Sequence, residues 1–157
     1  MTNLRPATEA DISTLAPLWR EAWIAGHADH VPAELTAQRT VESFAIRLKP
    51  LLDGTAVAER DGVILGFCAL KGGELYQIMV SAEARGAGTA KLLMNDAFAR
   101  QRAHGYEKIW LDCAVGNDRA AAFYRKNGWV LAKTVIEPVE TLGEPFPLEV
   151  WRFEHVL

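Results

Sequence analysis

The sequence predicts a mixed α/β domain in which a central, mostly antiparallel sheet is flanked by helices. Apolar residues recur at helical spacing over residues 12–23 and again over 90–97. Between these segments lie short apolar runs separated by Asp-Gly and Gly-Gly turns, a pattern typical of antiparallel strands. The 157 residues, half of them hydrophobic, suffice for one core, so residues 1–157 are expected to form a single domain.

Two helices are expected in the first third of the chain. The run from Thr8 to Asp11 places acidic residues in the first turn of a helix. The apolar stripe that follows consists of Ile12, Leu15, Ala16, Trp19 and Trp23. Pro17 cannot donate a backbone hydrogen bond to Ser13, so we expect a kink or a broken first turn. A second helix is expected from Pro32 to about Lys49. Its inward-facing residues are Val41, Phe44 and Leu48.

Three strands and a third helix are expected after Pro50. The strands cover residues 55–59, 63–71 and 74–80, with turns at Asp61-Gly62 and Gly72-Gly73. The helix opens at residues 85–88 and ends at Gly105. Its apolar face consists of Ala90, Leu93, Met94 and Ala97.

The last third of the chain is expected to contain a strand, a short helix and a closing pair of strands. The strand covers residues 108–114 and the helix covers 118–126. The closing strands cover 129–136 and 148–156 and are joined by a proline-rich loop. The predicted order of elements is therefore α-α-β-β-β-α-β-α-β-β.

Charge and hydropathy exclude several classes of protein. Seventeen basic and twenty acidic residues give a formal charge of −3, so no bulk attraction draws the domain to nucleic acid or to an anionic membrane. The longest apolar run, residues 63–70, is less than half of a membrane span, and no signal peptide is evident. Cys68 and Cys113 form no C-x-x-C pair, which indicates neither a zinc site nor a disulfide framework. We expect a cytoplasmic domain.

The junction between a strand and a helix at residues 79–90 is the most informative segment. Small residues at positions 86, 87, 88 and 90 leave the first-turn amides of the helix uncovered. Such amides, at the positive end of the helix dipole, suit a pyrophosphate. The segment is neither a P-loop nor the dinucleotide fingerprint, because it lacks Gly-Lys-Ser/Thr and the third glycine. A turn that uses glycine only for tight helix packing is the alternative.

The second informative segment runs from Asn117 to Trp129. Tyr124 follows Asn117 by seven residues, so both side chains lie along the same helical face. Taken alone, Phe123-Tyr124 is also explained by core packing.

Together the two segments resemble the GNAT superfamily of N-acetyltransferases. Residues 85–90 match its Arg/Gln-x-x-Gly-x-Gly/Ala motif. Asn117, Phe123-Tyr124 and Gly128-Trp129 match its second motif, with Trp129 replacing the usual Phe. The opening run from Arg5 to Asp11 is also similar to the start of many members. The resemblance covers essentially the whole chain and implies a GNAT-like fold.

The resemblance implies that acetyl-CoA is the co-substrate. The pyrophosphate would be held by the motif residues Arg85, Gly86, Ala87, Gly88, Thr89 and Ala90. The backbones of Met79 and Val80 would contact pantetheine and the thioester carbonyl, and Asn117 would contact the pantetheine arm. Tyr124 matches the general acid of the family, which protonates the departing CoA thiolate.

Two carboxylates are candidates for the base that deprotonates the attacking amine. Glu74 begins a strand in which residues 74, 76, 78 and 80 are expected to share one face, and some family members carry a catalytic Glu here. Asp112 lies before Asn117, where other members carry their base. A solvated strand end explains Glu74 equally well, and a structural role explains Asp112. A water chain without a single base is the third possibility.

The acceptor amine is expected to bind near the end of the first helix. His27 would border its site, and Trp23 and Tyr76 would line it, although core packing also explains both aromatic residues. Asp29 and His30 follow His27, but no fourth ligand is evident, so no metal site is expected. A cationic acceptor is favoured by Glu137, Glu140 and Glu144, which solubility alone also explains.

These features predict an N-acetyltransferase that passes the acetyl group directly to a primary amine of a small molecule or peptide in a ternary complex. Because no histidine neighbours Cys113, an acyl-cysteine intermediate is not expected. The alternative function is a non-catalytic module on the same fold that senses acyl-CoA or binds a protein. A structural domain without a ligand is a further alternative. Dimers are common in this superfamily, so a homodimer stays open.

Overall fold

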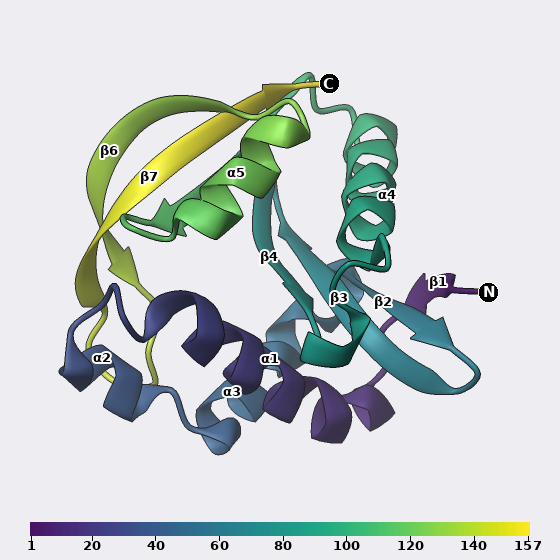
Figure 1. Cartoon of the computed structure of the whole chain (residues 1–157), viewed down its shortest axis with the longest axis horizontal. Coiled ribbons are helices and arrows are strands. Elements are labelled where there is room, and N and C mark those ends of the chain that lie inside the picture. The colour runs from purple at the N-terminus through teal and green to yellow at the C-terminus, as the bar shows by residue number, and fades with distance from the viewer.

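Seven strands form one sheet in the order β1-β2-β3-β4-β5-β7-β6 (Figure 1). The computed structural model describes the whole chain, residues 1–157. The strands are β1 (Asn3–Pro6), β2 (Thr55–Arg60), β3 (Val63–Lys71), β4 (Glu74–Val80), β5 (Lys108–Ala114), β6 (Val130–Val139) and β7 (Phe146–Val156). All neighbours are antiparallel except β4 and β5, which are parallel. The predicted fold class, a mixed α/β domain with a mostly antiparallel sheet, is confirmed.

Helices cover both faces of this sheet. They are α1 (Ile12–His27), α2 (Ala33–Gln38), α3 (Val41–Leu48), α4 (Thr89–Ala103) and α5 (Asp118–Lys126). Short 3-10 turns lie at Glu9–Asp11, Lys49–Gly54 and Ala82–Ala84. On one face Trp19 of α1 and Phe44 of α3 pack on Phe67, all completely buried. On the other face Leu93 and Met94 of α4 pack with Ala121 of α5. None of the helices is long and apolar enough to span a membrane.

The first helical region differs from the sequence prediction. The helix expected from Pro32 to Lys49 is broken into α2 and α3, because Arg39 leaves helical geometry with a ψ of 63°. Thr40 then caps α3, and its hydroxyl accepts a hydrogen bond from the amide of Ser43 at 3.1 Å. Val41 was predicted to face inward, but as the first residue of α3 it is 43% exposed. α1 continues through Pro17, and the irregular turn lies before it at Glu9–Asp11.

Strand predictions were accurate where a local turn defines the strand. Asp61 and Gly62 have φ values of 50° and 79°, as the hairpin turn between β2 and β3 requires. Strand β1 was missed because four residues ending in a proline carry no readable alternation. The closing strands β6 and β7 are longer than expected and reach Pro138 and Pro147.

A β-bulge in β4 decides which side chains face which helices. Ala69 of β3 lies opposite Gln77 and Leu70 lies opposite Leu75, so Tyr76 is an extra residue in β4. Tyr76 and Met79 consequently pack on the α1 side, whereas Leu75, Ile78 and Val80 belong to the cluster beneath α4. The prediction that residues 74, 76, 78 and 80 share one face is therefore wrong.

The two central strands, β4 and β5, pair only at one end. Glu74 lies opposite Trp110, and the amide of Trp110 donates to the carbonyl of Gly73 at 3.2 Å. Beyond this pair the register contains no further partner for β4 on its β5 side. β5 pairs with β7 along the whole length of β5. The sheet therefore divides into two parts, β1 to β4 and β5 to β7, that meet only at one end.

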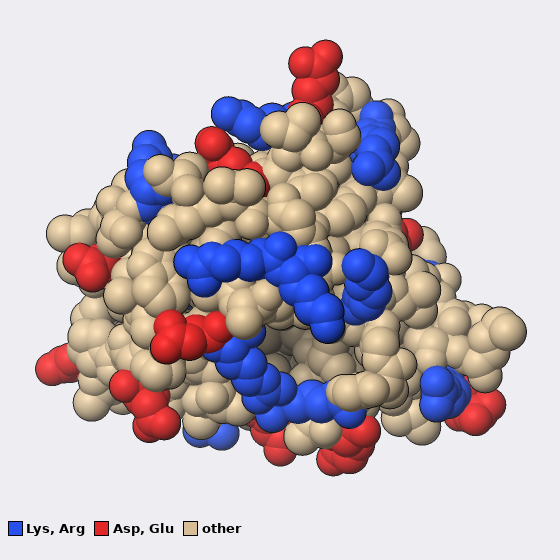
Figure 2. Space-filling view, turned by 45° about the horizontal axis from the view of Figure 1, so that its top comes forward, with Lys and Arg blue, Asp and Glu red and all other residues tan.

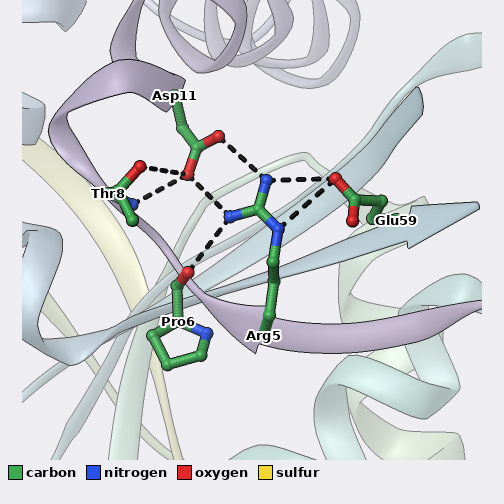
Figure 3. A network of polar contacts seen from close by, with 5 residues as sticks. All are labelled: Arg5, Pro6, Thr8, Asp11 and Glu59. Atoms are coloured by element: carbon green, nitrogen blue, oxygen red, sulfur yellow. Dashed lines mark hydrogen bonds and ion pairs between the residues drawn. The ribbon is translucent and has the colours of Figure 1, made fainter. Parts of the chain in front are cut away.

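A network around Arg5 ties β1 to β2 and to the start of α1 (Figure 3). The Arg5 guanidinium donates to both carboxylate oxygens of Asp11 at 2.8 and 2.9 Å and to Glu59 at 3.1 Å. The amide of Thr8 also donates to Asp11 at 2.8 Å. The Arg5 hydrogen bonds lower the pKa of Asp11 from 3.8 to about 2.

We expect Asp11→Asn to lower the free energy of unfolding by on the order of 1 kcal/mol at pH 7, a value discounted for partial solvent screening. Because folding lowers the pKa of Asp11, this contribution is present above pH 4 and is lost as the pH falls through about 2. Urea denaturation should show the difference from wild type falling to about half by pH 3. Asp53→Asn, at an exposed carboxylate, is the control. A difference that does not change between pH 7 and pH 3 would refute the argument.

Candidate active site

A cleft of about 750 Å³ opens where β4 and β5 part. One wall is the stretch of β4 from Leu75 to Val80, and the facing wall comprises Asp112, Cys113, Gly116 and Asn117. The first turn of α4, the inner side of α5 and the C-terminal end of α1 from Ala22 to His27 complete the lining. The cleft therefore joins both motifs that the sequence analysis singled out.

The first turn of α4 presents backbone N–H groups that have no partner in the chain. Gly86 and Gly88 adopt left-handed backbone, with φ values of 79° and 81°. The amides without a partner are those of Gly86, Gly88, Thr89, Ala90 and Lys91. Together with the helix dipole they form an anion site. Of the predicted residues here, Arg85, Gly86, Gly88, Thr89 and Ala90 line the cleft. Ala87 does not, and its amide donates to Ala84 at 3.3 Å.

Basic side chains surround this part of the cleft. Figure 2 shows Lys and Arg side chains around a hollow on one face of the molecule. The basic residues that line the cleft are Arg85, Lys91, Arg119 and Lys126. The ammonium of Lys91 is held by the side-chain oxygen of Asn127 at 2.9 Å. The cleft thus attracts anions although the whole chain is acidic.

The backbone of β4 has free groups that face the cleft. The amide of Ser81 donates to the carbonyl of Leu65 in β3 at 2.8 Å. The backbone N–H and C=O groups of successive residues in a strand point to opposite sides, so those of Met79 also face β3. Those of Ile78 and Val80 therefore point toward the space between β4 and β5. Met79 and Val80 both line the cleft, as predicted, but the free backbone groups belong to Ile78 and Val80.

Asn117 lines the cleft and also stabilises α5. Its side-chain oxygen caps the helix by accepting from the amide of Ala120 at 3.3 Å. The side-chain nitrogen stays free to donate, and it lies so close to Gly26 that a Cβ there would be 3.2 Å away. The absence of a side chain at position 26 therefore lets α1 approach Asn117.

Tyr124 is at once a core residue and a cleft residue. Its ring packs against Phe123, Trp129 and Phe153 with centroid distances of 5.8 to 6.3 Å. The side chain also lines the cleft. Burial raises the pKa of the Tyr124 hydroxyl above its ordinary value, so the group is protonated at neutral pH, as an acid must be.

A smaller cavity of about 190 Å³ adjoins the cleft on the α1 side of the sheet. His27, Tyr76, Gln77 and Asp112 line both spaces. Glu74 and Trp23 line only the smaller one. The structure thus brings the predicted acceptor residues Trp23, His27 and Tyr76 together with both candidate bases.

The two candidate bases have different surroundings. Asp112 accepts two hydrogen bonds from Arg152, at 2.8 and 2.9 Å, because the residues lie opposite each other in β5 and β7. Glu74 makes no ion pair. Burial, followed by the nearby charge of Asp112, raises the pKa of Glu74 from 4.5 to about 7. A carboxyl group with this pKa can exchange protons at neutral pH.

His27 stands between the two spaces as a neutral imidazole. Its Nδ1–H donates to the carbonyl of Trp23 at 2.9 Å, and its ring stacks on Trp23 at 4.8 Å. Burial lowers the pKa of His27 to about 4, so Nε2 keeps its lone pair. Asp29 and His30 are exposed, and nowhere in the chain do three or more His, Cys, Asp or Glu side chains gather as metal ligands would.

Three arginines of the site were missed by the sequence analysis. Arg152 is found only through the register of β5 and β7. Arg39 and Arg47 are 4% and 8% exposed and line the smaller cavity. Arg47 follows Phe44 by three residues, so a basic residue within an apolar helical face was the available signal.

Two of the three glutamates expected to attract a cation form ion pairs instead. Glu137 pairs with Arg152 at 3.1 Å, and Glu140 pairs with Lys71. Glu144 is exposed and does not line the cavity. The charge of this loop therefore gives no support for a cationic acceptor.

Comparisons with known proteins agree with this geometry. The family model described as "Acetyltransferase (GNAT) family" matches residues 13–129. An uncharacterized N-acetyltransferase of Mycobacterium tuberculosis is 28% identical over 111 residues, which cover 68% of this chain and 71% of that protein.

Solved structures show the same fold. A GCN5-related N-acetyltransferase from Rhodopseudomonas palustris is similar with a TM-score of 0.81 and 24% identity, over 100% of this chain and 96% of that one. The PaiA N-acetyltransferase of Thermoplasma acidophilum, solved with coenzyme A, is similar with a TM-score of 0.71 and 20% identity. That match covers 100% of this chain and 99% of the other.

Proposed function

The chain belongs to the GNAT family of acetyltransferases, and we propose that it transfers the acetyl group of acetyl-CoA directly to a primary amine. The acceptor would be a small molecule or a peptide, and residues 1–157 would form one catalytic domain. The observation that carries the proposal is the row of unpartnered amides that the first turn of α4 presents to the cleft. Every helix start leaves such amides unpaired, but here they open onto a cleft with a basic rim, which suits an anionic co-substrate.

Acetyl-CoA would occupy the larger cleft. The amides of residues 86 and 88–91 would bind its pyrophosphate, and the basic rim would attract its phosphates. The free backbone groups of Ile78 and Val80 would pair with the amides of the pantetheine arm, as an added strand pairs with a sheet edge. The side-chain nitrogen of Asn117 would donate to the same arm. The relative from Thermoplasma acidophilum, which was solved with coenzyme A, supports this choice of co-substrate.

The acceptor would reach the thioester from the smaller cavity. The two spaces share Tyr76, Gln77 and Asp112, so both substrates can be present at once. Burial raises the pKa of the Cys113 thiol to about 12, so it is not a ready nucleophile at neutral pH. Direct transfer in a ternary complex therefore requires fewer assumptions than an acyl-cysteine route.

In the proposed reaction the neutral amine nitrogen attacks the thioester carbonyl carbon. A C–N bond forms and the C–S bond breaks, and the N–H of Val80 would stabilise the negative charge on the carbonyl oxygen. The amine proton passes through water to Glu74, and the Tyr124 hydroxyl gives its proton to the departing sulfur. The products are the N-acetylated acceptor and the CoA thiol. Proton exchange with solvent then restores both side chains.

Glu74 is the better candidate for the base. The Arg152 guanidinium already engages both oxygens of Asp112, which makes Asp112 a structural carboxylate. Glu74 has no such partner and a pKa of about 7. Glu74 does not share a face with Val80, contrary to the sequence prediction, but its place in the smaller cavity supports the role of base.

A non-catalytic module that senses acyl-CoA is the alternative function. Such a module would bind acetyl-CoA but release no thiol. A thiol-release screen of acetyl-CoA with a library of amines distinguishes the two. The enzyme proposal predicts acceptor-dependent release, whereas tight binding without release from any amine would favour the sensor.

We expect Gly88→Glu to abolish acetyl-CoA binding. A side chain here would cover the uncommitted amides, and its carboxylate would repel the pyrophosphate. Gly105→Glu is a matched control, because Gly105 has a similar φ of 90° and lies outside the cleft at the other end of α4. Calorimetry should show wild-type affinity in the control only. If Gly88→Glu binds acetyl-CoA as tightly as Gly105→Glu and the wild type, the assignment of the phosphate site is wrong.

We expect Tyr124→Phe to slow acetyl transfer by about 10²-fold, within the usual range of general acid catalysis. The substitution keeps the ring contacts with Trp129 and Phe153 and removes only the proton donor. Single-turnover rates, together with acetyl-CoA affinity by calorimetry, separate the chemical step from binding. An unchanged single-turnover rate would assign Tyr124 to packing alone.

We expect the kcat/KM of the wild type to rise with pH through about 7, as Glu74 loses its proton. Glu74→Gln should lose about 10²-fold at pH 7 and recover partly at pH 9, where more of the amine is neutral. Asp112→Asn should change the rate much less while lowering the thermal unfolding midpoint, because it disrupts the contact with Arg152. The reverse behaviour would transfer the role to Asp112, and two near-normal rates would leave solvent as the proton acceptor.

A further inference from the structure

We propose that the smaller cavity binds an acceptor of the amino acid class, in which a carboxylate accompanies the reacting amine, and that Arg39 and Arg47 hold this carboxylate. The inference rests on the proposed function, since it names the amine that this site acetylates. It follows from the surroundings of two arginines that the sequence analysis did not include.

Both guanidiniums are buried without a counter-ion. Neither takes part in any ion pair of the chain. Arg39 donates to the backbone carbonyl of Glu140 at 2.6 Å, and Arg47 donates to the Tyr76 hydroxyl at 3.0 Å. Three of their nitrogen atoms are buried without a hydrogen-bond partner, namely Nε of Arg39 and both Nε and Nη1 of Arg47. Unpaired buried cations are unfavourable, so the cavity favours an anion.

Apart from Glu74, each of the other charged groups of the cavity already has an ion-pair partner. Lys71 pairs with Glu140, while Asp112 and Glu137 share the guanidinium of Arg152. The charged groups left without a partner are the two arginines and Glu74. Burial, together with the neighbouring charge of Arg47, lowers the pKa of Arg39 to about 10, in keeping with a cation that lacks an anion.

Aromatic rings hold the two guanidiniums in place. Arg47 lies over Trp19 at 4.6 Å, and Arg39 lies over Trp23 at 5.4 Å. A guanidinium fixed in this way presents its N–H groups with little further loss of conformational freedom. The planar fork of N–H donors matches the two oxygens of a carboxylate.

The cavity therefore offers different chemistry to the two ends of an amino acid. The arginines would bind the carboxylate, and Glu74 would receive the proton of the amine. A cavity of about 190 Å³ restricts the acceptor to a small molecule. A polyamine would bring further positive charge toward the arginines and is disfavoured.

The test compares acceptors that differ only at the carboxylate. Thiol release from acetyl-CoA is measured with free amino acids, with their amides and with the decarboxylated amines. We expect kcat/KM for the free amino acids to exceed that of the matched amides by about 10- to 100-fold, the range for hydrogen bonds to a charged group.

Arg39→Gln and Arg47→Gln should lower the ratio of kcat/KM for free amino acids to kcat/KM for their amides toward one. Arg60→Gln, which removes an exposed guanidinium far from the cavity, should keep the wild-type ratio. Thermal unfolding checks that the variants fold. If Arg47→Gln does not fold, two measurements still test the carboxylate site. One uses Arg47→Lys, which keeps the charge but loses the planar fork, and the other is the comparison of acceptors with the wild type.

Each outcome bears separately on the two proposals. Equal or better acetylation of amides and simple amines would overturn the carboxylate site and leave the acetyltransferase in place. If no amine is acetylated, the proposed function fails, and calorimetry of N-acetyl amino acids on the CoA-saturated protein tests the anion site alone. Binding that is lost in Arg39→Gln or Arg47→Gln would support that site, and no binding by the wild type would overturn it.

Discussion

The site depends on one structural constraint, namely that β4 and β5 pair at a single position and then part. Strands in the middle of a sheet normally satisfy each other's backbone groups. Here the C-terminal half of β4 has no partner on its β5 side, so the N–H and C=O groups of Ile78 and Val80 face the cleft. The same separation places the first turn of α4 and the inner side of α5 on a common space. A ligand with its own amides and phosphates can satisfy these groups, whereas closure of the two strands would leave no room for it.

The bulge at Tyr76 separates the surfaces that line the two spaces of the site. One extra residue in β4 reverses the facing of everything before it relative to everything after it. Tyr76 therefore turns toward α1, while Ile78 and Val80 remain on the α4 side. The smaller cavity forms on the first side, and the unpartnered amides lie near the start of α4. The two meet at Tyr76 and Gln77, where the thioester and the amine would have to come together.

Local sequence patterns predicted the parts of the molecule that local geometry determines. The hairpin at Asp61-Gly62 and the turn at Gly86 and Gly88 follow from backbone conformations that glycine or aspartate tolerate. Other features depend on residues far apart in the chain and carried no local pattern. The pairing of Asp112 with Arg152 requires the register of β5 and β7, and the bulge requires that of β3 and β4. The roles of Glu137 and Glu140 were misjudged for the same reason, since their partners are distant in sequence.

The burial of Glu74 matters because of the energy of the proton transfer it would accept. The ammonium form of a primary amine such as that of lysine has a pKa near 10. Moving a proton from this ammonium group to an ordinary glutamate therefore costs about 8 kcal/mol. A pKa of about 7 for Glu74 reduces this cost to about 5 kcal/mol. Full pairing with an arginine would lower the pKa of the carboxyl and lose that advantage. Burial raises the pKa of Glu74, and Arg152 pairs with Asp112 instead, so Glu74 is the carboxylate better suited to accept the proton.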